Sequence, residues 1–209
     1  MTKYCLSCFE EIKSSYIRRL FEKDIKLCSK CIEQIDVNIK LLKVDGNKIL
    51  FLSTYDGILK SWLMNFKEYG DIALAPCFLY LFIPIIKLFY SDYIFLPLPS
   101  SRKRNENRGF VHLEEMLKPY NFKYLNVFEK EDDKEQKNND YAARRKEKQI
   151  FLNNNKDKIK DKKVVLFDDI YTSGQTYKDC KKALIEANPK KIKGLIIMDN
   201  RQSIKLKIN

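Results

Sequence analysis

Two adjacent carboxylates, Asp168 and Asp169, end an apolar run in the stretch VVLFDDIYTSGQTYKDC. Like charges side by side repel each other, so this arrangement indicates a ligand. An apolar strand followed by a helical pattern puts a helix N-terminus just after the carboxylates, where free N–H groups bind phosphate. The segment between is Thr172, Ser173, Gly174, Gln175 and Thr176. A phosphate held in this segment and hydroxyl groups held by the carboxylates together describe a ribose 5-phosphate.

Three other interpretations compete for this stretch. A Walker B acid needs a Walker A loop, and the chain contains no Gly-Lys pair. A dinucleotide fold needs G-x-G-x-x-G, and no two glycines lie two residues apart. A helix with a Thr or Ser N-cap accounts for the hydroxyl residues, but it does not account for both aspartates.

Four of the six cysteines form a metal-binding pattern. The two C-x2-C pairs, Cys5 with Cys8 and Cys28 with Cys31, are separated by nineteen residues. Each turn presents two thiolates, and the loop between them allows all four to meet on one tetrahedral ion. Without an export signal the thiols should stay reduced, so structural zinc is favoured over disulfides. We expect Cys77 and Cys180 to be small core residues.

The composition limits the class of protein. About 44% of the residues are hydrophobic, so a packed core is feasible. The net charge of +12 favours anionic partners, although the lysines are spread along the chain. The stretch 72–86 carries no charge, but it is short for a spanning helix and holds Pro76 and Pro84. We therefore expect no transmembrane segment and a cytoplasmic protein, with peripheral contact at the inner face of the membrane left open.

The surrounding patterns predict an α/β fold. Residues 162–169 and 191–199 read as buried strands, with a helical pattern between them that ends before Pro189. Earlier in the chain, apolar residues around Trp62 recur at helical spacing, and residues 93–96 read as a buried strand that leads into a basic loop. Such a unit belongs to an open parallel sheet, which binds ligands at the carboxyl ends of its strands. Residues 1–40 form a four-Cys zinc-ribbon module, and 41–209 form the second domain. The polar residues 129–149 are a candidate flexible loop.

The stretch VVLFDDIYTSGQT resembles the phosphoribosyl-pyrophosphate (PRPP) motif of type I phosphoribosyltransferases. The four-Cys module, YDGILKSWLMNFKEYGD, FLPLPSSRKRNENRGF and the loop with Gln136, Arg144 and Arg145 follow in an order that resembles the ComF family of competence proteins. The resemblance implies a sheet of the type I phosphoribosyltransferase type. It implies that Asp168 and Asp169 hold ribose hydroxyls, and that residues 172–176 wrap the 5-phosphate. It also implies a pyrophosphate loop at Ser100, Ser101 and Arg102. Further candidates for anion contact are Arg104, Arg108, Arg144 and Arg145.

The implied function is an accessory role in natural transformation: binding PRPP and handling incoming single-stranded DNA together with other competence proteins. The alternative is an active phosphoribosyltransferase of nucleotide salvage, with magnesium bound to PRPP and an unknown acceptor. Val111 and His112 stand where the family usually has Asn-Gln. His112, the only histidine, is expected to be a surface residue of a helix.

Overall fold

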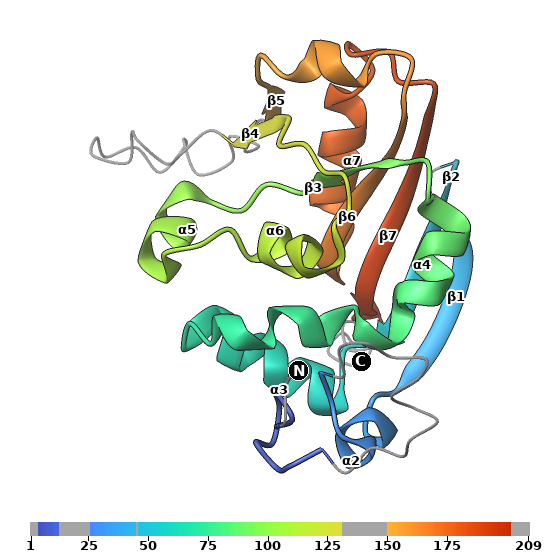
Figure 1. Ribbon diagram of the computed structural model, residues 1–209. Coiled ribbons are helices and arrows are strands. Elements are labelled where there is room, and N and C mark those ends of the chain that lie inside the picture. The colour runs from blue at the N-terminus through green and yellow to red at the C-terminus, as the bar shows by residue number, and fades with distance from the viewer. Residues whose placement is uncertain (1–3, 13–25, 45, 131–149, 202–209) are drawn as a thin grey trace, which may run out of the picture.

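The computed structural model describes residues 4–12, 26–44, 46–130 and 150–201 (Figure 1). Its central sheet has five strands in the order β1-β2-β7-β6-β3. Their bounds are β1 Val37–Val44, β2 Asn47–Thr54, β3 Ile94–Pro97, β6 Lys163–Tyr171 and β7 Lys191–Asp199. Strands β2, β7, β6 and β3 run parallel, and β1 pairs antiparallel with β2 at one edge. The predicted open α/β sheet is confirmed, with one antiparallel edge strand added.

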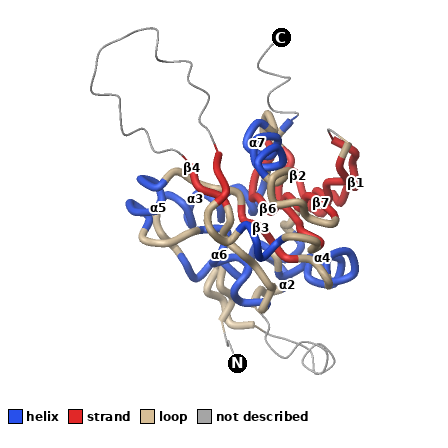
Figure 2. The backbone as a smooth tube through the Cα atoms, turned by 90° about the horizontal axis from the view of Figure 1, so that it is seen from above, coloured by secondary structure: helices blue, strands red, loops and turns tan. Residues whose placement is uncertain are grey.

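Helices cover both faces of the sheet. The α-helices are α2 Ser29–Glu33, α3 Gly57–Glu68, α4 Ile83–Tyr90, α5 Arg102–Arg108, α6 His112–Leu117 and α7 Gln175–Ala183. The 3-10 helices are η1 Ile72–Phe78, η2 Tyr80–Phe82, η3 Lys118–Tyr120 and η5 Lys156–Ile159. Seen from above, α7 lies on one side of the sheet, and α4 and α6 lie on the other (Figure 2). In Figure 1 the arrowhead of β7 points toward α3, so α3 sits at the carboxyl edge of the sheet.

The two inner strands are buried because they are almost continuously apolar. In β6 residues 164–167 are all buried, and in β7 the same holds for residues 194–198. Gly194 of β7 lets α7 approach closely, since a Cβ there would lie 2.9 Å from the ring of Tyr177. Its carbonyl oxygen accepts a 2.8 Å hydrogen bond from the Tyr90 hydroxyl of α4. Glycine is therefore required at this position by packing.

The apolar stretch after α3 folds as short helices. The segment Ile72–Tyr90 is long and apolar enough to cross a membrane by length and composition alone. Here Pro76 lies within η1 and Pro84 begins α4, so the segment is divided into η1, η2 and α4. Phe78, Phe82 and Ile86 from these three helices are at most 1% exposed and belong to the core.

Several elements differ from the sequence expectations. The segment after β3 was expected to be a basic loop, but its residues 102–108 form α5, which buries none of its residues. Strand β1 was not expected, and it crosses the predicted domain boundary after residue 40. That domain boundary stays a prediction. Most of the candidate loop 129–149 lies outside the described residues. Its first two residues belong to β4 (Phe128–Lys130), which pairs antiparallel with β5 (Ile150–Leu152).

Candidate ligand pocket and metal centre

A pocket of about 1130 Å³ lies at the carboxyl ends of β3 and β6. Eight of the residues singled out in the sequence line it: Ser100, Ser101, Arg102, Arg104, Asp168, Asp169, Thr172 and Thr176. The segment after β3 and the segment at the end of β6 meet because the two strands are parallel neighbours. The pocket lining carries five cationic side chains against three carboxylates. The surroundings therefore favour an anionic ligand.

The two aspartates have different surroundings. Both lie within β6, which continues to Tyr171, so their side chains point to opposite faces of the sheet. Asp169 is 4% exposed. It forms an ion pair with Lys67 of α3, and its Oδ2 atom lies 3.3 Å from Nε2 of His112 in α6. Burial alone would raise the pKa of Asp169, but Lys67 and His112 together lower it below its usual range.

Asp168 is half-buried and forms no ion pair within the described residues. Its Oδ1 atom accepts a 3.0 Å hydrogen bond from the backbone N–H of Asp169. Burial, and after it the negative charge of Asp169, raises the pKa of Asp168 well above its usual value. Hydroxyl donors from a ligand would stabilise this carboxylate. Of the two aspartates, Asp168 is thus the one available to a ligand.

His112 departs from the sequence expectation. It was expected to be a surface residue, but it is 4% exposed and begins α6 inside the pocket wall. Its Nδ1 atom lies 3.4 Å from the hydroxyl oxygen of Ser100. Burial lowers the pKa of His112, and the neighbouring Asp169 opposes that shift. A buried imidazole needs polar partners, and Asp169 and Ser100 supply one for each ring nitrogen.

The turn after β6 depends on glycine. Gly174 has φ +74°, and a Cβ there would lie 2.0 Å from the Tyr171 hydroxyl oxygen. It precedes α7 without a side-chain cap. Instead, the hydroxyl of Ser173 accepts a 3.3 Å hydrogen bond from the N–H of Gln175. Ser173, Gly174 and Gln175 shape this turn, whereas Thr172 and Thr176 line the pocket.

Arg108, another predicted contact, is not among the residues that line the pocket. The Nε atom of Arg108 donates a 3.2 Å hydrogen bond to the backbone oxygen of Lys67, and its guanidinium lies 5.8 Å from the centre of the Phe110 ring. Arg108 therefore ties α5 to α3. The candidates Arg144 and Arg145 lie outside the described residues. The roles assigned to all of these positions stay predictions.

Sequence reasoning missed some pocket residues. Lys67 and Lys130 line the pocket but were not singled out. Lys67 belongs to a helix recognised by its apolar spacing, whose buried side chains are Leu59, Trp62, Leu63 and Phe66. Nothing local distinguishes Lys67 from other lysines on that helix. Lys67 is distinguished only by its contact with Asp169, which is distant in the sequence and is brought close by the fold.

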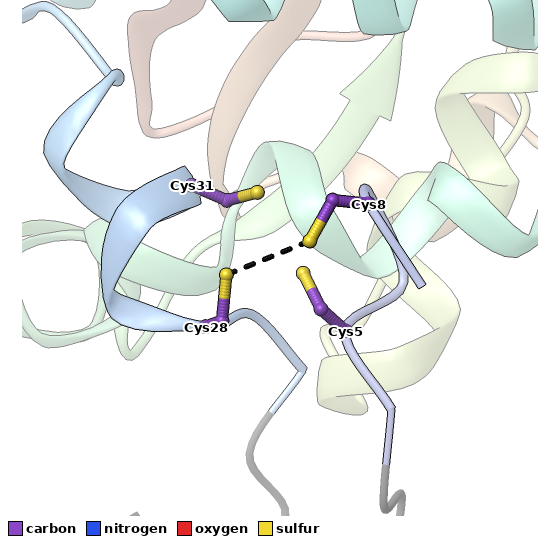
Figure 3. Close-up of side chains that lie close together, drawn as sticks. All are labelled: Cys5, Cys8, Cys28 and Cys31. Carbon is purple, nitrogen blue, oxygen red and sulfur yellow. Dashed lines mark hydrogen bonds between the residues drawn. The ribbon is translucent and has the colours of Figure 1, made fainter. Parts of the chain in front are cut away.

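The four cysteines converge as predicted (Figure 3). Their sulfur atoms all lie within 4.8 Å of one another, and Cys8 and Cys28 are 3.7 Å apart. Zinc–sulfur bonds of about 2.3 Å place the sulfurs of a tetrahedral site roughly 3.8 Å apart. Burial raises the pKa of Cys5, but backbone N–H groups outweigh this and lower it to about 7, whereas burial raises the pKa of Cys31 above its usual value. The residues present fit a structural zinc ion.

The cysteine cluster rests on α3. Ser7, between Cys5 and Cys8, accepts a 2.8 Å hydrogen bond from Nε1 of Trp62. In Figure 1 the N-terminal segment and α2 lie beneath α3, with the sheet on its other side. Cys77 and Cys180, expected in the core, are 1% and 0% exposed. Their prediction as core residues is confirmed.

Comparisons with known proteins agree with these features. The phosphoribosyl transferase domain family matches residues 111–209. The competence protein ComFC of Streptococcus pneumoniae is 32% identical over 140 residues, which make up 67% of this chain and 63% of that protein. ComFC of Bacillus subtilis is 28% identical over 139 residues, or 64% and 56% of the two chains. The chain thus spans less than two thirds of the length of either relative.

A crystal structure of a hypoxanthine-guanine phosphoribosyltransferase from Bacillus anthracis also matches. The sequence identity is 17% and the TM-score is 0.38, with 62% of this chain and 68% of that chain covered.

Proposed function

This chain is a homologue of the competence protein ComFC with a phosphoribosyltransferase domain, and from that premise we propose that it binds PRPP and handles incoming single-stranded DNA during natural transformation. The observation that carries the proposal is the pocket, in which Asp168, Thr172 and Thr176 face Ser100 and Ser101 across a cationic lining. We place the protein in the cytoplasm at the inner face of the membrane, with other competence proteins as partners.

In this proposal the ribose and the phosphates of PRPP contact different walls of the pocket. The ribose hydroxyls donate to Asp168, and the 5-phosphate binds at the turn before α7, where Thr172 and Thr176 line the pocket. The pyrophosphate lies against Ser100, Ser101 and the cations of α5. Magnesium enters bound to the pyrophosphate and neutralises part of its charge. Asp169 supports this wall through its contacts with Lys67 and His112.

Calorimetry with PRPP and magnesium tests the pocket. Asp168→Ala removes an acceptor for a ribose hydroxyl, and a hydrogen bond to a charged group is worth about 1.5–3 kcal/mol. We expect PRPP affinity to fall by roughly ten- to a hundredfold. Asp157→Ala, at an exposed carboxylate of η5, should leave affinity unchanged. Ribose 5-phosphate should bind more weakly than PRPP, and Thr176→Ala should weaken both ligands alike.

Absence of PRPP binding to folded, zinc-loaded wild-type protein would rule out this assignment of the pocket. Release of pyrophosphate from PRPP in the presence of a nucleobase would instead assign the alternative function, a phosphoribosyltransferase.

Binding of single-stranded DNA should be sensitive to salt. Helix α5 exposes Arg102, Lys103 and Arg104 at the pocket rim. If about three phosphates are neutralised, affinity should fall roughly twentyfold between about 50 and 200 mM salt. Reversing these three charges should weaken binding without sequence preference. The matched control reverses Lys156 and Lys158, which are exposed on η5, and binding that ignores salt would contradict an electrostatic contact.

A further inference from the structure

Three polar side chains in the pocket wall lie next to one another in series. Ser100 follows β3, His112 begins α6, and Asp169 lies in β6. The Ser100 hydroxyl oxygen is 3.4 Å from Nδ1 of His112, and Nε2 of the same ring is 3.3 Å from Oδ2 of Asp169. Ser100 is half-buried and lines the pocket, whereas the other two are nearly fully buried. Ser100 is therefore the most accessible of the three to a ligand.

The partners of His112 determine where its proton lies. The Asp169 carboxylate can only accept hydrogen bonds, and it also pairs with Lys67. A carboxylate 3.3 Å from Nε2 favours the tautomer of His112 that carries its proton on Nε2, and in that tautomer the lone pair of Nδ1 faces the Ser100 hydroxyl. A hydroxyl next to a base that is oriented by a third group is the arrangement that activates a serine nucleophile. Distances slightly longer than ideal are common in such sites before a substrate binds.

We propose that Ser100, His112 and Asp169 form a serine-nucleophile site that hydrolyses small anionic phosphate esters through a phosphoserine intermediate. This activity goes beyond PRPP binding and does not depend on it. Ser100 is the nucleophile and His112 is the base that contacts its hydroxyl. Asp169 is a positioning residue, which acts by fixing the tautomer of His112.

The reaction balances in two steps. In the first, the Oγ–P bond forms while the bond from phosphorus to the leaving oxygen breaks. The serine proton moves to Nδ1 of His112 and then to that leaving oxygen. In the second step water attacks phosphorus, its proton passes through Nδ1 to Ser100 Oγ, and the Oγ–P bond breaks. The products are the free alcohol and inorganic phosphate, and no oxidant or reductant is needed.

The charges around the serine favour phosphorus over a carbonyl carbon as the target. Lys103, Arg104 and Lys130 line the same pocket. Cations stabilise the charged oxygens of a transferring phosphoryl group. Arg102 at the same rim is paired with Glu106, so the other three cations carry more of this role.

The experiment uses a fluorophosphonate as the electrophilic probe and intact mass as the readout, without PRPP. Wild-type protein should gain one adduct, mapped by peptide digestion to Ser100. Ser100→Ala should gain none, and His112→Gln should react about a hundredfold or more slowly, the usual contribution of a general base. Ser91→Ala, at an exposed serine outside the pocket, is the matched control and should react like wild type. An unmodified Ser100, or modification unaffected by His112→Gln, overturns the proposal.

Turnover is measured with p-nitrophenyl phosphate. Wild type and Ser91→Ala should release nitrophenolate, and Ser100→Ala should not. Adduct formation with no turnover above that of Ser100→Ala would overturn the hydrolytic step.

The tautomer can be observed directly because the chain has a single histidine. In nitrogen NMR of histidine-labelled protein, the proton should be on Nε2. In Asp169→Asn the side-chain amide can donate to Nε2, so the proton should move to Nδ1 and labelling of Ser100 should be lost. A proton on Nδ1 in the wild type would overturn the role given to Asp169, even if His112→Gln failed to fold.

Discussion

Cys5→Ser should abolish zinc binding and unfold the N-terminal segment. Cys5 is fully buried within the four-sulfur cluster, and three thiolates with a serine hydroxyl hold the ion less tightly. Apparent zinc binding supplies roughly 10–16 kcal/mol in small zinc-dependent modules, so a segment with so little apolar core should not stay folded without it. Metal analysis and thermal unfolding of the variant measure both effects.

The matched control is Cys180→Ser, at a buried cysteine outside the cluster. It should retain one zinc ion per chain, although it loses some core packing. A reduced, folded wild-type protein that contains no zinc would contradict the metal assignment.

Asp169→Ala should destabilise the protein far more than Asp168→Ala. The mutation leaves Lys67 without its ion-pair partner beside the nearly fully buried His112. Breaking a buried pair by removing one partner costs about 3–5 kcal/mol. Chemical denaturation of the two single variants gives the comparison.

A double variant distinguishes loss of the ion pair between Lys67 and Asp169 from other destabilising effects of the Asp169→Ala substitution. Lys67→Met should reduce the cost of Asp169→Ala, because no lysine is then left without a partner. If Asp169→Ala costs the same in the wild-type background and in the Lys67→Met background, the ion pair is not what stabilises this wall.

The contacts of His112 and Asp169 also determine how the stability of the fold should change at acidic pH. The pKa of His112 is lowered from 6.5 in the folded state, so the unfolded chain takes up a proton that the folded chain does not. The stability due to neutral His112 should be present above about pH 6.5 and decline below it. The lowered pKa of Asp169 adds a second loss below about pH 4. His112→Gln should remove the first decline and leave the second.

The sequence predicted the elements whose patterns are regular. Residues 191–199 were expected as a strand and form β7, and the apolar spacing around Trp62 predicted α3. The sequence did not predict α5, because its residues RKRNENR include no apolar residue and therefore show no hydrophobic periodicity. The sequence also failed to predict β1. The apolar residues Val37 and Leu41 lie at its exposed positions, so the apolar positions of this strand do not coincide with its less exposed ones.

The pocket was only partly predictable for a different reason. Asp168 and the threonines were found because one short stretch contains the end of β6, the turn and the start of α7. The burial of His112 depends on Asp169 and Ser100, which other elements bring to it. A polar residue in a helical pattern has no local feature that reveals such partners, so it was assigned to the surface.

Helix α3 joins the metal centre to the pocket. Trp62 donates to Ser7 beside two of the cysteines, and Lys67 pairs with Asp169. The two residues are five positions apart, or about 7.5 Å along the helix axis. A shift of α3 after oxidative release of zinc would therefore pull on the ion pair that shapes the ligand site. Thermodynamic reciprocity then requires the converse: an occupied pocket should raise the affinity for zinc, so that a chelator removes less of it at equilibrium, and metal retention under oxidative stress would depend on the cell's supply of ligand.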